Sequence, residues 1–400
     1  MRPLKVLTFT TLYPNVAQPR HGIFVESRVQ KLAASEDIAP VVIAPVPYVP
    51  LRPTTVIGAP VRYDAIPERE QRAGVEVWHP RFAAIPKLGL AINPLVMASR
   101  CLPLARRLDA AVGGFDLVDA QYLFPDAVAG VILARWLGKP ALMTARGSDV
   151  NVMARQRLPA AWMRWAWRRA TGVITVSAKL KQDLVALGVE DSRVTVLRNG
   201  VNLELFRPLD RDAARRQTDV DGRTLLSVGN LVTEKGHDIV IRALGQLRDD
   251  ARLVVIGQGP ERERLQELAR VLRLQDRVRW VEHVSQEVLA QYYCAADLTV
   301  LASHREGMPN VVLESLACGT PVVASAVGGI PEVLGHDLAA GALVERLTPE
   351  DFASAIGPRL QATVDRDRIR AHAQGFGWDA TIARQIDLFR QAAGPTLRPT

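Results

Sequence analysis

The chain of 400 residues contains only three cysteines and no long apolar run. Cys101, Cys294 and Cys318 lie far apart and form no CxxC pair, which argues against a disulfide framework and against a structural zinc site. We interpret them as reduced core residues of a cytoplasmic protein. No segment reaches the roughly 20 apolar residues that a membrane-spanning helix needs. Zinc-finger, RNP-type and basic-zipper patterns are also absent, so we expect no nucleic-acid partner.

Charge is unevenly distributed along the chain, whose formal net charge is +8. Residues 1–200 hold 26 Lys+Arg against 15 Asp+Glu, a balance of +11, and the remainder holds 24 against 27, a balance of −3. A basic half is typical of a protein that meets an anionic substrate or an anionic membrane. Arginines accompany apolar residues in Leu88–Arg107 and tryptophans in Arg155–Arg169. Peripheral membrane contact and ordinary core packing are both open for these stretches, and packing is the commoner use of such helices.

Strand patterns alternate with helical patterns through both halves, which predicts an α/β fold with doubly wound parallel sheets. The length favours two domains. The dipeptide Asn199-Gly200 marks a turn between the two series of alternations. We therefore place the domain boundary there, with residues 1–198 in the first domain and 199–378 in the second.

The stretch Ser303–Gly319 holds two carboxylates, Glu306 and Glu314, with seven residues between them. Pro309 suits the first turn of a helix and Gly319 suits the residue just past its end, so we expect Glu306 on the entering loop and Glu314 near the helix start. In open α/β sheets, ligands bind where a strand leads into a helix N-terminus, whose amides hold phosphate. Paired glutamates are usually solvated surface charges, but in this setting they can accept the hydroxyls of a sugar nucleotide.

The residues from Glu306 to Glu332 resemble the signature of the retaining glycosyltransferases of the family-4 group, E-G-x-P-x-x-x-x-E-A-x-A-x-G-x-P-V-V-A-S followed by G-G-x-x-E. Ser315 stands where alanine is usual. The resemblance implies the GT-B fold, in which two Rossmann-like doubly wound domains face a cleft. It assigns the acceptor to residues 1–198 and the nucleotide-sugar donor to 199–378. It also implies that the last helix, 379–393, crosses back to complete the first domain.

The same resemblance implies roles for residues on the donor side. Glu306 would hold hydroxyls of the donor sugar, and Glu314 would hold the ribose hydroxyls. Lys235 would stabilise the leaving diphosphate, since it lies at the spacing of the family's G-R-x-x-x-x-K-G pattern, although Asn230 replaces the arginine. Further donor-binding candidates are Gly22, Gly257, Gly259, Gly307, Met308, Pro309 and Asn310.

Besides Gly22, three candidates belong to the first half. Gln121 stands where many relatives carry a histidine close to the reacting sugar, and its amide can form hydrogen bonds but cannot titrate. Arg146 and Asp149 match an R-G-x-D sequence of the family, which suggests an acceptor-side cation and a catalytic carboxylate. An Arg146–Asp149 pair that only braces its loop is the alternative.

These observations predict a retaining, metal-independent glycosyltransferase that uses a UDP- or GDP-sugar in cell-surface polysaccharide biosynthesis. The expected acceptor is a glycan or a lipid-linked sugar, and association with the inner face of the cell membrane is a further hypothesis. We expect no cofactor and no metal, because the triplets 210–212 and 365–367 look like solvated helix charges rather than D-x-D metal motifs. A sugar-nucleotide epimerase on the same fold and a non-catalytic sugar-nucleotide-binding relative remain alternatives. A phosphorylase is not indicated, because no lysine lies in a pyridoxal-phosphate context.

Overall fold

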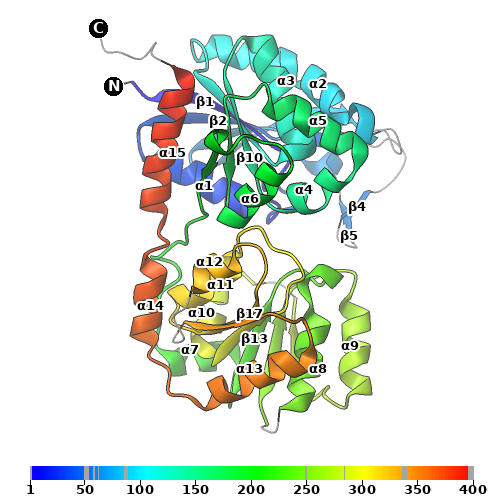
Figure 1. Ribbon diagram of the computed structural model, residues 1–400, viewed down its shortest axis with the longest axis vertical. Helices are drawn as coiled ribbons and strands as arrows, with labels where there is room; N and C mark the ends of the chain where they lie inside the picture. Colours follow the sequence, from blue (N-terminus) through cyan, green and yellow to red (C-terminus); the bar gives the residue numbers. More distant parts are fainter. Residues whose placement is uncertain are drawn as a thin grey trace. The chain divides into compact units, whose positions relative to one another are not determined.

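A computed structural model describes most of the chain. Residues 54–56, 59–61 and 89 are described by their backbone alone. The described ranges are 2–48, 54–56, 59–61, 63–84, 89–247, 250–282, 284–335 and 340–394. The chain divides into two compact units, one of residues 1–56, 60–199 and 379–400 and the other of residues 57–59 and 200–378. Each unit is a sheet covered by helices on both faces (Figure 1), as a doubly wound α/β fold requires. The first unit ends at Asn199, one residue beyond the boundary placed from the sequence.

The first unit is built on an eight-stranded sheet in the order β12-β11-β10-β9-β1-β2-β7-β6. Its described pairs are parallel except for the antiparallel β6–β7 pair. The strands are β1 Leu4–Phe9, β2 Ile38–Ile43, β6 Arg69–Arg72, β7 Val75–Trp78, β9 Leu117–Gln121, β10 Ala141–Ala145, β11 Gly172–Thr175 and β12 Val194–Val196. The first half of the chain also contains four short strands, β3 Val46–Tyr48, β4 Thr54–Val56, β5 Ala59–Val61 and β8 Arg81–Ala83.

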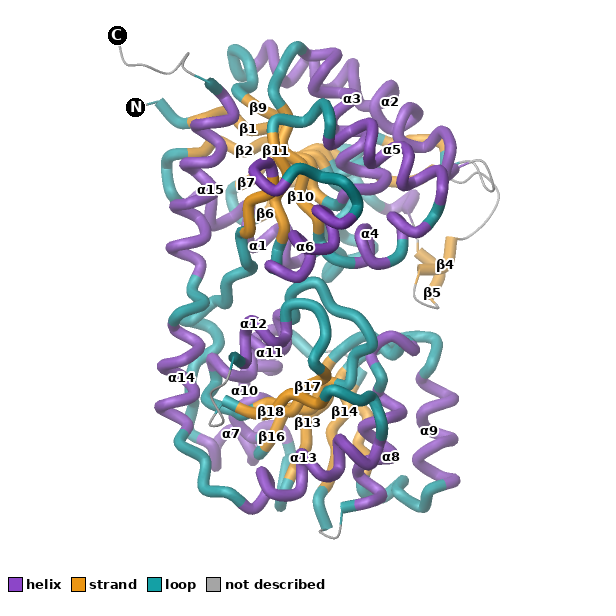
Figure 2. The backbone as a smooth tube through the Cα atoms, in the orientation of Figure 1, coloured by secondary structure: helices purple, strands orange, loops and turns teal. Residues whose placement is uncertain are grey.

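A single sheet lies at the centre of the second unit (Figure 2). It has six strands in the order β15-β14-β13-β16-β17-β18, and they are parallel throughout. Its strands are β13 Thr224–Val228, β14 Arg252–Ile256, β15 Val278–Val281, β16 Leu298–Leu301, β17 Val322–Ser325 and β18 Gly341–Val344. Most of these strand residues are fully buried, which explains why the strands read as continuous apolar runs rather than as alternating patterns.

Helices connect the strands of both units. In the first unit they are α1 Ile23–Ala34, α2 Gly89–Ala111, α3 Val128–Leu137, α4 Ser148–Asn151, α5 Arg157–Trp167, α6 Ala178–Ala186 and α15 Trp378–Ala393. In the second they are α7 Arg211–Thr218, α8 His237–Gln246, α9 Arg262–Val271, α10 Gln286–Ala295, α11 Asn310–Ala317, α12 Ile330–Leu334, α13 Pro349–Gln361 and α14 Arg366–Gln374.

Helix α15 returns to the first unit from the end of the second, as the resemblance implied. From Asp379 onward it is grouped with the first unit. Phe389 and Gln385 on this helix are buried, and Arg390 forms an ion pair with Asp37, which directly precedes β2. The chain therefore completes its first unit with its last helix.

Strand register fixes which residues reach the ligand-binding edge of the first sheet. Phe9 of β1 pairs with Ile43 of β2 and with Ala120 of β9, and Ile43 also pairs with Trp78 of β7. These four residues lie on one line across parallel strands, so the residues that follow them emerge at the same edge. Ligands of open α/β sheets bind at this carboxyl edge.

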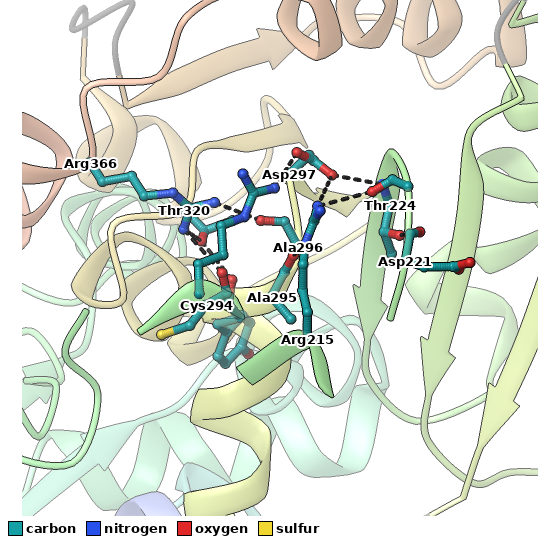
Figure 3. Close-up of polar contacts among 12 residues, drawn as sticks. Arg215, Asp221, Thr224, Cys294, Ala295, Ala296, Asp297, Thr320 and Arg366 are labelled. Atoms are coloured by element: carbon teal, nitrogen blue, oxygen red, sulfur yellow. Dashed lines mark hydrogen bonds and ion pairs between the residues drawn. The ribbon is translucent and has the colours of Figure 1, made fainter. Parts of the chain in front are cut away.

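The carboxylates of the two D-x-D triplets are exposed at the starts of α7 and α14, as the sequence suggested, and one carboxylate of each triplet also caps its helix. Asp210 and Asp365 are N-caps: their side chains accept the N–H of Ala213 at 2.6 Å and of Arg368 at 3.0 Å. Of the middle residues of the triplets, Arg366 turns toward the end of α10 (Figure 3), and Arg211 pairs with Asp297, which directly precedes β16. Nowhere in the described residues do three or more His, Cys, Asp or Glu gather as a metal site would require.

Asp297 is the centre of this network at the start of β16 (Figure 3). Its carboxylate accepts the N–H of Thr224 at 2.8 Å and a guanidinium N–H of Arg215 at 3.0 Å, and it also pairs with Arg211. Arg366 donates to the carbonyl of Ala296 at 2.8 Å and to the hydroxyl of Thr320 at 2.9 Å. One carboxylate thereby ties α7 to the first and fourth strands of the second sheet in chain order.

We expect Asp297→Ala to lower the free energy of unfolding by roughly 2–3 kcal/mol, because it leaves two arginines and one backbone N–H without their acceptor. Urea denaturation of the variant and the wild type measures this loss. The matched control is Asp221→Ala, since Asp221 forms an ion pair with Arg252 in which both side chains are more than half exposed. That exposed pair should contribute less than about 1 kcal/mol. Equal losses in the two variants would contradict the central role of Asp297.

Candidate active site

The predicted motif spans the loop after β16 and helix α11. Pro309 is the N-cap of α11, so it directly precedes the first turn in which the sequence analysis placed it. Gly319 follows the C-cap residue Cys318 and has a φ of +76°. Glu314 is the fifth of the eight residues of α11, so it lies at mid-helix rather than near the start. Glu306 lies on the loop that enters the helix, as predicted.

Lys235 and Glu306 form an ion pair, with 2.6 Å between Nζ and Oε1. The same carboxylate oxygen accepts the hydroxyl of Ser303 at 2.7 Å, and Ser303 accepts the hydroxyl of Ser325 on its own carbonyl at 2.6 Å. The Glu306 side chain is 10% exposed and that of Lys235 is 27% exposed. The structure therefore joins two residues that are far apart in sequence, and both keep some accessible surface.

Backbone contacts bring the two loops close enough for this pair. Gly236 has a φ of +62°, and a Cβ there would lie 2.0 Å from the carbonyl oxygen of Ala302. Gly328 has a φ of +57°, and its Cβ would lie 2.0 Å from the carbonyl oxygen of Glu306. Only glycine tolerates both the left-handed conformation and the lack of space. The loop that carries Glu306 is therefore held between two glycine turns.

A second ion pair joins the same two loops. Arg305 pairs with Glu234 at 3.3 Å, and the backbone N–H of His304 donates to the carbonyl of Glu234 at 2.8 Å. No pattern in the sequence pointed to Arg305, because the family pattern begins at Glu306. Arg305 adds a cation to the Lys235 loop, at which Asn230 replaces the usual arginine.

Glu314 accepts a hydrogen bond from the hydroxyl of Tyr293 on α10, at 2.9 Å. Burial raises the pKa of Glu314 to about 7, and the Tyr293 hydrogen bond opposes this rise only in part. Tyr293 is fully buried and lies 21 residues from Glu314, so no local pattern in the sequence pointed to it.

Ser315, the departure from the family pattern, is satisfied inside the second unit. Its hydroxyl lies 2.8 Å from the hydroxyl of Thr299 and 3.0 Å from the carbonyl of Thr320. The side chain is fully buried. The serine therefore ties α11 to β16 and to the turn before β17, and it does not disturb the motif.

The donor-side glycines Gly257 and Gly259 pack on the neighbouring loop. Their Cβ atoms would lie 1.8 Å from the carbonyl oxygen of Gly229 and 2.3 Å from that of Leu231. Asn230, in the same loop, is exposed, and its carbonyl lies 3.3 Å from Nε2 of His237. Burial lowers the pKa of His237 to about 4, so this ring is neutral and supports the loop rather than adding a charge.

In the first unit, Gln121 is buried within a polar chain at the end of β9. Its amide donates to Asp119 at 2.6 Å, and its carbonyl oxygen accepts from the guanidinium of Arg146. Arg146 also donates to Asn199 at 3.1 Å and lies over the ring of Phe24 at 5.2 Å. The structure thus joins Gln121 and Arg146, two residues predicted for this unit, through their side chains.

Burial shifts the pKa values of the charged residues in this polar network and of Arg28 beside it. It raises the pKa of Asp119 to about 6, against the Gln121 hydrogen bond and the charge of Arg146. It lowers the pKa of Arg146 to about 9 and that of Arg28 to about 10. Nε of Arg146 and Oδ1 of Asp119 are buried and have no hydrogen-bond partner among the described residues. Perturbed groups of this kind cluster at functional sites.

Asp149 braces its loop through main-chain groups rather than through the Arg146 guanidinium. Its carboxylate accepts the backbone N–H groups of Leu123 at 2.8 Å, Gly147 at 2.7 Å, Val150 at 3.0 Å and Arg146 at 3.0 Å. Burial raises its pKa, and these four hydrogen bonds oppose the rise. The geometry favours a positioning role for Asp149 over direct catalysis.

Gly22 and Asp126 shape the loop that follows β1. Gly22 has a φ of +74°, and a Cβ there would lie 2.2 Å from the carbonyl oxygen of Leu12. The glycine is therefore needed for the close approach of the protein's own backbone at Leu12. Asp126 is buried and accepts the Thr11 hydroxyl at 2.8 Å and the Thr11 N–H at 2.5 Å. Burial raises the pKa of Asp126 to about 7. Sequence reasoning missed this contact, because 115 residues separate its partners.

The tryptophans of α5 are engaged within the first unit. Trp162 donates to the carbonyl of Ala91 on α2 at 2.9 Å and packs edge-on against Trp165, and Trp167 is buried. This arrangement favours the core-packing interpretation of Arg155–Arg169. Among the described residues, no helix has the length and apolar character needed to cross a membrane.

Comparisons with known proteins agree with this architecture. Residues 210–375 match the family model of glycosyl transferases group 1, and residues 54–205 match that of glycosyltransferase family 4. The chain is 32% identical over 350 residues to TuaC of Bacillus subtilis (strain 168), a glycosyltransferase assigned to teichuronic acid biosynthesis, with 83% of each chain covered. It is 38% identical over 310 residues to the D-inositol 3-phosphate glycosyltransferase of Streptosporangium roseum, with 70% of each chain covered.

A solved structure shares the fold over nearly the whole chain. Anabaena Alr3699/HepE in complex with UDP and glucose aligns with a TM-score of 0.72 at 20% identity, covering 96% of this chain and 98% of that chain. The expected GT-B fold is thereby confirmed. With the two family matches and the similarity to TuaC, these findings show that the chain belongs to the family-4 glycosyltransferases, of the glycosyl transferases group 1 type.

Proposed function

We propose that this glycosyltransferase transfers a sugar from a UDP- or GDP-sugar with retention of configuration and without a metal. The observation that carries the proposal is the Lys235–Glu306 ion pair, next to the first turn of α11. A helix start offers unsatisfied N–H groups and a positive dipole end to phosphate oxygens. Uridine is the first base to test, because the similar fold of Alr3699/HepE binds UDP.

Each residue of the second-unit site has a role in this proposal. Glu306 accepts hydroxyls of the donor sugar, and Lys235 leaves Glu306 for the diphosphate as negative charge develops on the leaving group. A cation aimed at that developing charge lowers the barrier. Glu314 accepts the ribose hydroxyls, and Tyr293 fixes its orientation. Sugar transfer passes through an oxocarbenium-like state, so positioning and electrostatics supply most of the catalysis.

For the acceptor, we propose a glycan or a lipid-linked sugar of cell-surface polysaccharide assembly, reached from the cytoplasmic side of the membrane. The similarity to TuaC, whose name places it in teichuronic acid biosynthesis, and the basic first half of the chain support this assignment. In the first unit, Gln121 and Arg146 are the acceptor-side candidates, with Asp119 and Asp149 as positioning residues.

We expect Lys235→Gln and Glu306→Gln to lower kcat/KM by roughly 10²–10³-fold, because each removes a group that acts on charge or hydroxyls in the transition state. The rate of nucleotide release from a panel of UDP- and GDP-sugars measures the loss. Glu234→Gln is the matched control, since it removes the neighbouring exposed carboxylate that pairs with Arg305. The proposal fails if UDP, GDP and ADP all fail to bind the folded wild type in calorimetry.

Nucleotide affinity should depend on the protonation of Glu314. Burial raises its pKa to about 7, so the carboxylate is ionised above pH 7 and takes up a proton below it. An ionised carboxylate accepts two ribose hydroxyls better than a protonated one. We expect the affinity for the bound nucleotide to fall several-fold from pH 8 to pH 6. In Glu314→Gln the affinity should be lower at pH 8 and retain only the pH dependence of the nucleotide itself; equal pH profiles would contradict the role.

Chelation and product analysis separate the proposal from its alternatives. Excess EDTA should leave nucleotide release unchanged, because the proposed charge stabilisation comes from Lys235 and the α11 amides. A transferase releases one nucleoside diphosphate per sugar transferred, whereas an epimerase releases none in productive turnover. NMR of the product should give the anomeric configuration of the donor. Inversion, or a loss of activity that added metal restores, would refute the corresponding part of the proposal.

A further inference from the structure

A cavity of about 760 Å³ lies in the first unit, lined by none of the residues predicted for the donor or the acceptor side. Its walls come from the residues after β7, from the start of β8 and from the middle of α2. Three arginines line it, Arg81, Arg100 and Arg107, with Glu68 as the carboxylate among the described lining residues. The cavity therefore carries an excess of positive charge.

Each of the three arginines is held by groups that leave its charge uncompensated. Arg81 donates to the carbonyl of Ile66 at 3.1 Å, and Arg100 donates to the carbonyl of Arg81 at 3.4 Å. The guanidinium of Arg107 lies over the ring of Trp78, 5.0 Å from its centroid. Throughout the ranges that the structure describes, no ion pair joins these three guanidinium groups to a carboxylate. The arginines are pre-positioned, and their charges are available to a ligand.

The rest of the lining suits an organic anion rather than a bare ion. His79 is buried, and its two ring nitrogens lie 3.0 Å from the carbonyl of Ala44 and 2.8 Å from Glu70. Both nitrogens therefore already have hydrogen-bond partners within the protein. Pro80 and Leu104 add apolar surface to the wall. Ligand sites typically combine apolar walls with a few convergent polar groups.

The position of the cavity relates it to the acceptor side of the first unit. Trp78 and Ala120 lie on the same line across the sheet, so the cavity and Gln121 share the carboxyl edge. Three strand spacings of about 4.8 Å separate β7 from β9, or roughly 14 Å. An extended acceptor whose reacting hydroxyl lies near Gln121 could place a second group in the cavity.

We propose that this cavity binds a phosphate group of the acceptor. Guanidinium groups recognise phosphate oxygens through paired N–H donors, and three arginines that lack carboxylate partners provide such donors here. The phosphate belongs to a lipid or to a soluble phosphate ester, and the chemistry in the cavity is the same for both. Phosphate binding itself does not depend on the donor chemistry, whereas the assignment to the acceptor rests on the proposed function.

Substitution of Arg107 tests the cavity with a matched control on the same helix. Arg107→Gln removes a charge that lines the cavity, and Arg107→Lys keeps this charge but loses the paired N–H donors of the guanidinium. Arg106→Gln is the control, because it removes the adjacent exposed charge that does not line the cavity. The probes are inorganic pyrophosphate in calorimetry and sedimentation with phosphatidylglycerol vesicles, with phosphatidylcholine vesicles as the reference. We expect Arg107→Gln to weaken binding at least about tenfold, Arg107→Lys to weaken it less and Arg106→Gln to change it less than twofold.

The two probes separate the sources of the phosphate. Vesicle binding that needs Arg107 supports a lipid phosphate, and pyrophosphate binding that needs Arg107 without vesicle binding supports a soluble ester. Equal losses in Arg107→Gln and Arg106→Gln, or no binding of either probe to the wild type, would overturn the proposal. Arg100→Gln repeats the test without disturbing the contact with Trp78. Unchanged UDP or GDP binding in all variants shows intact folding, and failure of every nucleotide to bind the wild type would instead refute the proposed function.

Discussion

The ion pair between Lys235 and Glu306 is the interaction on which the candidate donor site depends. It joins the loops after β13 and β16, which are neighbours in the second sheet. Partly burying two charges has a desolvation cost that their attraction offsets only when the geometry is good, and here Ser303 adds a hydrogen bond to the same carboxylate oxygen. Gly236 and Gly328 allow the backbone approach that the pair needs. Under the proposed function, the donor replaces both contacts of this ion pair. Its sugar hydroxyls bind Glu306, and its diphosphate binds Lys235.

The first unit supports its candidates by a different means, a buried chain of polar groups. Gln121 lies between Asp119 and Arg146, so its amide orientation is fixed by a donor contact on one side and an acceptor contact on the other. A histidine at this position could exchange protons, whereas a glutamine held in this way can only position its neighbours. Under the proposed function, Arg146 is then the cation of this unit, and its guanidinium lies over the ring of Phe24.

Much of the fold and part of the site could be predicted from local patterns. The continuous apolar strands, the turn at Asn199-Gly200 and the E-x7-E motif all follow from residues close in sequence, and the structure has the corresponding strands, unit boundary and helix. Where the sequence was less accurate, the error was local: Pro309 caps α11 instead of entering it, and the capping roles of the exposed Asp210 and Asp365 were not predicted. Caps depend on the backbone angles of one residue, which composition and periodicity do not fix.

The sequence by itself determined the α/β class, the two series of strands and helices and the family motif, because each of these rests on periodicity or on fixed spacing. Only the tertiary structure decided which side chains meet. Tyr293 reaches Glu314, Thr11 reaches Asp126, and three arginines surround one cavity in the first unit. Such contacts join distant segments through sheet order and register, and their burial sets the pKa values of Glu314 and Asp126. Neither sheet order nor burial can be read from the spacing of residues along the chain.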